Sequence, residues 1–157
     1  MSRKEIGLSI SAALPREIKL LLASQHLGVL ATHHQGQPHA SLVAFAADPD
    51  GRRLLLATTR TSRKYANLQS DPRAALLIDS RGQAAADFHQ AMALTAKGVV
   101  QEVAGGERDS LAAVFLAKHP HLREFVEAPS CALLALQVEV YELVSRFQQV
   151  LIYRLAP

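Results

Sequence analysis

Short aliphatic or alternating stretches bounded by turn residues recur along the chain and predict a protein built mainly of β-strands. Three of them follow one another in the first third of the sequence, at Leu27–Thr32, His39–Ala47 and Arg52–Thr59. Turn residues rich in Gly, Pro and Asp separate them at 33–38 and 48–51. Because such short connections join neighbouring antiparallel strands, the three stretches predict a meander.

Further strands are predicted in the second half of the chain. Arg73–Asp79 is a short aliphatic run, and Ala91–Val103 and Ala132–Val144 are long and alternating. The sequence QQVLIYRL at 148–155 predicts a last strand, and RGQAAADFHQ at 81–90 predicts a mobile loop. Six to seven mostly antiparallel strands favour a small closed β-barrel, since closure removes exposed sheet edges.

Three segments predict helices. Pro15–Ser24 places its apolar residues at helical spacing, and Glu107–Lys118 carries one apolar stripe. Between them, Thr61 or Ser62 can cap a helix of about two turns that ends before Pro72. The predicted fold class is therefore a mainly β, antiparallel barrel with short helices.

Length and composition indicate one folded unit. The chain has 157 residues, of which 49% are hydrophobic and 20% charged, and we predict a single domain over residues 1–157. Its most apolar region, Leu20–Leu30, is interrupted by polar residues and falls short of the roughly 20 residues that cross a bilayer. The N-terminal segment lacks the apolar core of a secretory signal, so we expect a cytoplasmic protein with no membrane partner. The lone cysteine, Cys131, excludes an internal disulfide and a cysteine-based zinc site.

Positive charge is concentrated in one segment. Between Arg52 and Arg81 seven basic residues accompany two acidic ones, a balance of +5, whereas the rest of the sequence sums to −2. No series of aromatic side chains alternates with these basic residues, as a surface that stacks on bases requires. We therefore expect no nucleic-acid partner and infer that the charge serves a small anion.

The segment TTRTSRK at 58–64 joins a predicted strand to a predicted helix. Free backbone N–H groups and the positive end of the helix dipole favour an anion there. Arg60, Arg63 and Lys64 add cations that the dipole disfavours, which indicates a negative ligand such as a phosphate. Neutral donors are supplied by the hydroxyls of Thr58, Thr59, Thr61 and Ser62. An ordinary solvated face with Ser62 as a plain helix cap is the alternative, and charge and capping leave it open.

The sequence LLLATTRTSRKYANLQSDPRAALLI at 54–78 resembles the signature of the pyridoxamine 5′-phosphate oxidase-like, FMN-binding split-barrel family. GVLATHHQGQPHASLVAF at 28–45 is similar to the first hairpin of that family, and ALTAKGVVQEV at 93–103 to its fifth strand. The resemblance runs from about Leu14 to Pro157 and is weakest between Gly105 and Pro129. It implies a homodimer of split barrels with FMN at the interface.

Matching positions assign the flavin contacts that the resemblance implies. In that family a Ser-Arg-Lys run binds the FMN phosphate, the second strand follows the isoalloxazine ring, and a Gln and a C-terminal Arg reach the cofactor. Residues 62–64 match the Ser-Arg-Lys run, and residues 41–43 match the second strand. Gln90 lies within one position of the family's flavin-contacting Gln. The predicted cofactor-binding residues are Ser41, Leu42, Val43, Thr58, Thr59, Arg60, Ser62, Arg63, Lys64, Gln90 and Arg146.

The chain also departs from the true oxidases. Where they carry an Arg and, five residues later, a Lys directed to the phosphate, this chain has Ser41 and Ala46. Two cations are missing unless Arg60 substitutes for them. The segments that bind pyridoxal phosphate, including an Arg-Leu-His-Asp-Arg motif, have no counterpart, so we do not expect a vitamin B6 oxidase.

Seven histidines raise the question of a metal or haem ligand. His33, His34 and His39 lie at a predicted hairpin tip with no supporting Cys or acidic residue, and a polar tip is the simpler interpretation. His119 and His121 flank a proline at a helix end, where cations complement the dipole. We predict no metal site, but a branch of the same superfamily binds and degrades haem, which keeps an axial histidine open by resemblance.

Three functions follow from these features. The first is an FMN-binding flavoprotein, an oxidoreductase of the flavin reductase or oxidase type acting on a small-molecule substrate. The second is a haem-binding or haem-utilisation protein on the same fold. The third is a non-catalytic flavin sensor in which the ligand orders the loop at 81–90. The sequence identifies neither the substrate nor a catalytic residue.

Overall fold

A single sheet closes on itself to form the barrel. The computed structural model describes residues 2–82, 90–146 and 149–157, so residues 83–89 of the predicted loop and residue 148 of the predicted last strand lie outside the described residues. The strands run in the order β1-β8-β7-β4-β3-β2-β5-β6, and β6 pairs with β7, which closes six strands, β2 to β7, into the predicted antiparallel barrel. The strands of the described residues are β1 (Ser2–Leu8), β2 (Leu27–His34), β3 (Gln37–Ala47), β4 (Arg53–Thr59), β5 (Arg73–Asp79), β6 (Ala93–Glu102), β7 (Cys131–Ser145) and β8 (Gln149–Leu155).

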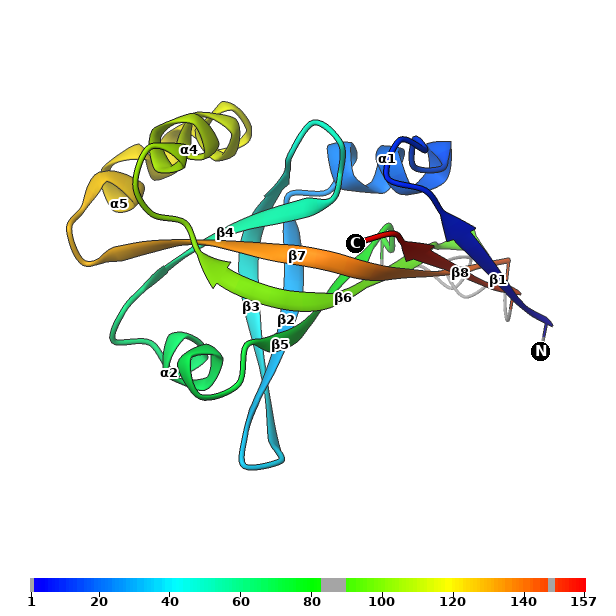
Figure 1. Cartoon of the computed structure of the whole chain (residues 1–157), viewed down its shortest axis with the longest axis horizontal. Helices are drawn as coiled ribbons and strands as arrows, with labels where there is room; N and C mark the ends of the chain where they lie inside the picture. Colours follow the sequence, from blue (N-terminus) through cyan, green and yellow to red (C-terminus); the bar gives the residue numbers. More distant parts are fainter. Residues whose placement is uncertain (1, 83–89, 147–148) are drawn as a thin grey trace.

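Short helices cover the barrel at three places (Figure 1). Helix α1 (Arg16–Ser24) lies where β2 begins, and α2 (Arg63–Ser70) lies where β4 finishes. Helices α4 (Glu107–Lys118) and α5 (Arg123–Glu127), joined by the 3₁₀ turn η1 (Pro120–Leu122), pack on the outer side of β4 and β7. The three helices expected from the sequence are therefore confirmed.

Alternation along the strands divides the hydrophobic residues between two cores. In β3, Val43 and Phe45 point into the barrel with Ile18 of α1 and Leu68 of α2. Ala46, the next residue along, belongs to a second cluster that β4 and β7 form with α4 and α5. Position 46, where the true oxidases carry a lysine, is thus buried beneath a helix in this chain.

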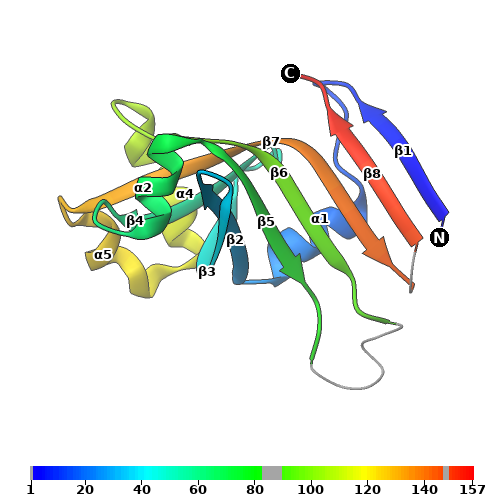
Figure 2. The ribbon, with the colours of Figure 1, turned by 90° about the horizontal axis from the view of Figure 1, so that it is seen from below.

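Strand β1 was not predicted. It pairs in parallel with β8, and Figure 2 shows the two as a ribbon at the side of the barrel. Most of its side chains are exposed, and only Ile6 and Leu8 pack against the core. A strand that takes its stability from pairing rather than burial carries little hydrophobic alternation, which explains why the sequence pattern did not reveal it. No helix in the described part of the chain has both the length and the hydropathy that crossing a membrane requires.

Candidate anion site at the start of α2

Five of the seven basic residues between positions 52 and 81 have their positive charge engaged. Arg53 pairs with Asp48, Arg73 with Asp71 and Arg81 with Asp79. Arg52 donates to the backbone carbonyls of residues 9, 10 and 156, and Arg60 pairs with a glutamate. Within the described residues, the two that remain without a hydrogen-bond or ion-pair partner are Arg63 and Lys64. They are adjacent, and they are the pair that the sequence assigns to a phosphate.

The local structure at these two residues favours an anion. Ser62 caps α2, because its Oγ accepts the N–H of Tyr65 at 3.2 Å, and Thr58 Oγ1 lies 2.8 Å from the same Oγ. The backbone N–H groups of Arg63 and Lys64, at the first two positions of the helix, have no acceptor inside it. Its first turn contains no acidic residue to balance the dipole, whereas that of α4 contains two.

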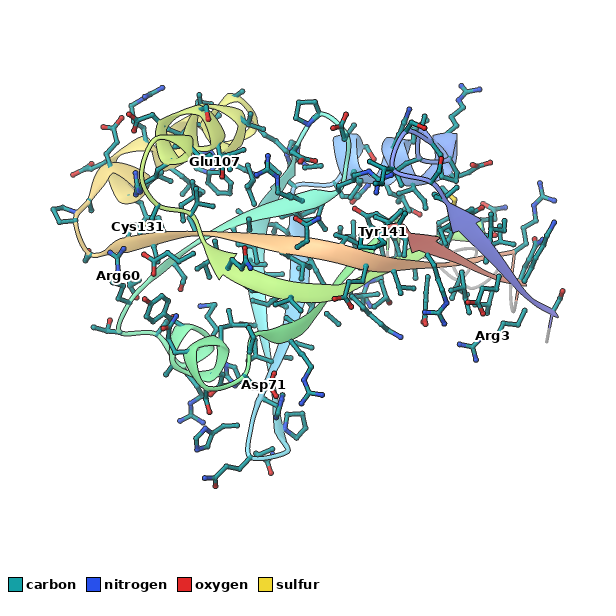
Figure 3. The ribbon with its side chains drawn as sticks, viewed as in Figure 1. Arg3, Arg60, Asp71, Glu107, Cys131 and Tyr141 are labelled. Atoms are coloured by element: carbon teal, nitrogen blue, oxygen red, sulfur yellow. The ribbon has the colours of Figure 1, made fainter. Side chains whose placement is uncertain are left out.

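Arg60 differs from the prediction that it faces the same anion. Its guanidinium donates to the carbonyls of Pro129 at 2.8 Å and Cys131 at 3.0 Å and forms a very short ion pair with Glu102 (Figure 3). Tyr65 Oη also donates to Glu102, at 2.8 Å. Burial opposes ionisation of Glu102, but these hydrogen bonds lower its pKa below the ordinary value. Arg60 therefore ties the turn before α2 to β6 and to the start of β7, and it is not a free cation.

Strands β3 and β4 part beside α2. Strand β3 pairs with β2 along most of its length, but among the described residues it pairs with β4 only through Phe45–Ala47. The edge of β3 from residue 37 to residue 44 that faces β4 is therefore unpaired, and its backbone groups are free for a ligand. A continued ladder would place Val43 opposite Thr58 and Leu42 opposite Thr59. In that register the predicted ring-binding segment 41–43 would lie across the gap from Thr58 and Thr59, the predicted flavin-binding residues at the end of β4.

Side chains at this parting have different exposures. Leu42 lies on the outer face of the barrel and is 68% exposed, whereas Val43 points into the core. Ser41 lies on the inner face, and its Oγ is a buried polar atom with no hydrogen-bond partner in the described structure. A buried hydroxyl without a partner is costly, so this atom fits a site that a polar ligand completes.

A cavity of about 260 Å³ lies between α2 and the tip of the β2–β3 hairpin. Arg63 and Asn67 line it from the helix, and two histidines line it from the hairpin. Asn67 Nδ2 donates to Thr32 Oγ1 at 3.0 Å, which holds the helix against β2. No sequence pattern places these histidines at the site, because the approach of α2 to the hairpin tip depends on the tertiary fold. The lining residues are His34, Gln37, Pro38, His39, Arg63 and Asn67.

Gln90 and Arg146 do not join the other predicted residues. They line a separate cavity of about 540 Å³ formed by the start of β6, the end of β7, β8 and α1. In Figure 1 this region lies at the opposite end of the molecule from α2. Within one chain, the structure therefore brings residues 41–43 and 58–64 together and leaves Gln90 and Arg146 apart.

Hydrogen bonds distinguish the histidines. His33 accepts the N–H of Gly36 at Nδ1 and contacts Asp71 through Nε2 at 2.9 Å, so both of its ring nitrogens are engaged. His119 is buried, with Nε2 2.7 Å from the carbonyl oxygen of Phe45. Across the described residues, no cluster of three His, Cys, Asp or Glu side chains could hold a metal ion.

The fold and site define a split β-barrel protein in which β3 and β4 separate beside a helix start that carries two unpaired cations. The family model described as pyridoxamine 5′-phosphate oxidase matches residues 14–145, and the chain belongs to this family. A pyridoxamine 5′-phosphate oxidase homolog of Schizosaccharomyces pombe is 37% identical over 76 residues, which are 43% of this chain and 40% of that protein. The match thus spans less than half of this curated relative.

Solved structures share the fold at low sequence identity. A haem-binding protein from Mycobacterium smegmatis has a TM-score of 0.80 at 22% identity, covering 91% of this chain and 60% of that one. A FAD-binding protein from Mesorhizobium loti has a TM-score of 0.66 at 19% identity, covering 81% of this chain and 89% of that one. A putative pyridoxamine 5′-phosphate oxidase from Listeria innocua has a TM-score of 0.65 at 16% identity, covering 82% and 95%.

Proposed function

We propose that this protein binds FMN where β3 and β4 part and acts as an oxidoreductase on a small-molecule substrate. One observation carries the proposal: of the seven basic residues between positions 52 and 81, only Arg63 and Lys64 lack a partner in the described structure, and both stand in the first turn of α2. Two adjacent unpaired cations at a helix start are arranged to receive a dianionic phosphate group.

The other residues at the parting fit the rest of a flavin. The hydroxyl of Thr59 and the free N–H groups at the start of α2 are donors for the phosphate, while Thr58 and Ser62 shape the turn that presents them. The unpaired edge of β3 at residues 41–43 offers peptide groups to the planar ring, and Ser41 adds a buried hydroxyl that has no other hydrogen-bond partner in the described structure. When bound, the flavin supplies the electron-transfer chemistry, and the protein supplies binding and orientation.

A second copy of the chain completes the proposed site. On the outer face of the sheet, Val29 of β2 lies opposite both Leu42 of β3 and Leu77 of β5. Leu42 and Leu77 are exposed, and the next row in the same direction consists of alanines 31, 40 and 75. An uncovered apolar face of this kind favours a partner protein surface. Leu42 also borders the proposed flavin position, so a homodimer through this face would lie beside the cofactor. We infer that Gln90 and Arg146, which lie apart from α2 within one chain, reach the cofactor from the partner subunit.

Similar structures support two ligands. The FAD-binding protein of Mesorhizobium loti shares the fold and is consistent with a flavin. The haem-binding protein of Mycobacterium smegmatis makes haem the second candidate, and the side chains of His34 and His39, which have no hydrogen-bond partner in the described structure, are the observation in its favour. FMN is the first candidate because two adjacent free cations and the backbone N–H groups of a helix start together suit a dianionic phosphate monoester.

Absorption titrations with FMN and haemin test the proposal. We expect FMN to bind, and the variant Arg63→Ala/Lys64→Ala to lose roughly 100-fold or more in affinity, since two charge-assisted contacts are removed. The matched control is Arg3→Ala/Lys4→Ala on β1, which removes the same adjacent pair of charges at another surface and should leave FMN affinity unchanged. Haemin uptake with no flavin uptake, or equal FMN affinity in both double variants, would contradict the proposal.

A further inference from the structure

The cavity between α2 and the β2–β3 hairpin is lined by cations and neutral donors. Arg63 contributes a guanidinium, His34 and His39 contribute imidazoles, and Gln37 and Asn67 contribute amides. Of the described residues that line it, none is acidic. An imidazole donates an N–H to an oxyanion in either protonation state and adds a positive charge when protonated. The lining therefore suits an anion rather than a cation or an apolar group.

His39 lies on β3 close to Ser41, the position at which the true oxidases carry a phosphate-directed arginine. It lies two residues before Ser41, so the two side chains emerge on the same face of β3. His39 is the register partner of Thr32, whose hydroxyl receives the amide of Asn67 from α2. The face of β3 that carries His39 is thus the face against which α2 packs, next to Arg63.

The neighbouring charges leave His34 and His39 available. Neither has a hydrogen bond or ion pair within the described residues, in contrast to His33, whose ring is held by Gly36 and Asp71. Asp71 follows the last residue of α2 and contacts His33 of the hairpin, and Arg73 binds it with hydrogen bonds that hold its pKa well below the usual range. Its carboxylate is therefore already paired and does not neutralise the imidazoles.

We propose that His39, assisted by His34, binds the terminal phosphate of the ligand together with Arg63 and so replaces the cations that β3 lacks. The ligand class is a phosphate monoester, and the inference rests on the proposed function in taking that monoester to be FMN. It adds two residues from the hairpin to the phosphate site, and neither belongs to the Ser-Arg-Lys run of α2. The site would then discriminate FMN from riboflavin, which has the same ring and no phosphate.

Flavin fluorescence titrations with FMN and riboflavin test the role of His39. We expect His39→Ala to weaken FMN binding about tenfold, the loss of one charge-assisted contact, and to change riboflavin binding less than twofold. His39→Arg, which restores a permanent cation, should bind FMN at least as tightly as the unmodified protein. The matched control is His121→Ala, which removes an exposed histidine from η1 and should change neither affinity.

The possible outcomes separate the two proposals. Equal FMN affinity in His39→Ala and the unmodified protein would overturn the histidine site while leaving the flavin site intact. Parallel losses for FMN and riboflavin would also overturn it, because they would place His39 at the ring. If the protein binds no flavin, thermal stabilisation by inorganic phosphate provides the second measurement. If phosphate no longer stabilises His39→Ala but still stabilises His121→Ala, the anion site in the cavity is supported without a flavin site. If phosphate stabilises both variants as it does the unmodified protein, the histidine site is overturned.

Discussion

His119 is a buried histidine whose surroundings oppose its protonation. Burial lowers its pKa, the hydrogen bond to the carbonyl of Phe45 opposes that shift, and the nearby Lys118, His26 and His121 lower the pKa further. Because the unfolded chain binds a proton more readily than the folded one, the free energy of unfolding should fall as pH drops below about 6.5, the ordinary value for histidine. Above that pH the contribution of His119 to stability is fully present.

Urea unfolding at pH 7.5 and pH 5.5 measures this effect. The unmodified protein should lose more stability between the two pH values than His119→Gln, which keeps an amide donor and cannot titrate. His121→Gln, an exposed neighbour, controls for the general loss of a histidine. An identical pH dependence in the unmodified protein and His119→Gln would show that His119 titrates alike in both states.

Individual site residues could be predicted where the signal is local. The pair Arg63 and Lys64 was identified because a strand end, a capping serine and two cations are consecutive in the sequence. The partner of Arg60 could not be predicted from the sequence, because Glu102 is 42 residues away and contacts Arg60 only when β6 closes the barrel. The location of His39 beside Arg63 depends in the same way on how α2 packs against the hairpin.

Strand β6 contains a position that only glycine can occupy. The register between β6 and β7 shifts at Lys97 and Gly98, and a Cβ atom at Gly98 would lie 1.8 Å from the carbonyl oxygen of Gln137. Because this obstacle is backbone, Gly98→Ala must displace one strand of the barrel. We expect a loss of about 3 kcal/mol in the free energy of unfolding, measured with urea.

Gly7→Ala on β1 is the matched control, since nothing lies within 4 Å of the position a Cβ would take. Its effect should stay within about 0.5 kcal/mol. Equal stability of the two alanine variants would mean that the barrel accommodates the bulge without glycine.

Elements were predicted where hydrophobic alternation matches burial. The strands of the barrel each bury one face, so their patterns revealed them, and Ser62 and Pro72 marked the ends of α2. The pattern cannot specify which strands pair. It did not indicate that β1 pairs in parallel with β8, or that β3 pairs with β4 only from Phe45 onward. The second of these features opens the candidate site.

At the scale of the whole molecule, the apolar outer face of β2, β3 and β5 is the surface through which we propose that two chains assemble. Figure 2 shows these strands side by side, and Leu42 and Leu77 are exposed on them. We expect the unmodified protein to have twice the 17.0 kDa mass of one chain in sedimentation or light scattering. Leu77→Glu should be monomeric, because the dimer would bury an unpaired carboxylate at its centre.

Leu20→Glu, which changes an exposed leucine of α1, is the matched control and should remain dimeric. The monomeric variant should also lose most of its FMN affinity, although Leu77 lies outside the phosphate site, because Gln90 and Arg146 lie far from α2 within one chain and, in the proposed dimer, would reach the flavin from the partner subunit. Full FMN affinity in a monomeric Leu77→Glu variant would mean that one chain holds the flavin alone. Leu77→Glu is therefore expected to abolish both dimerisation and FMN binding. Arg63→Ala/Lys64→Ala should abolish FMN binding and leave the dimer intact.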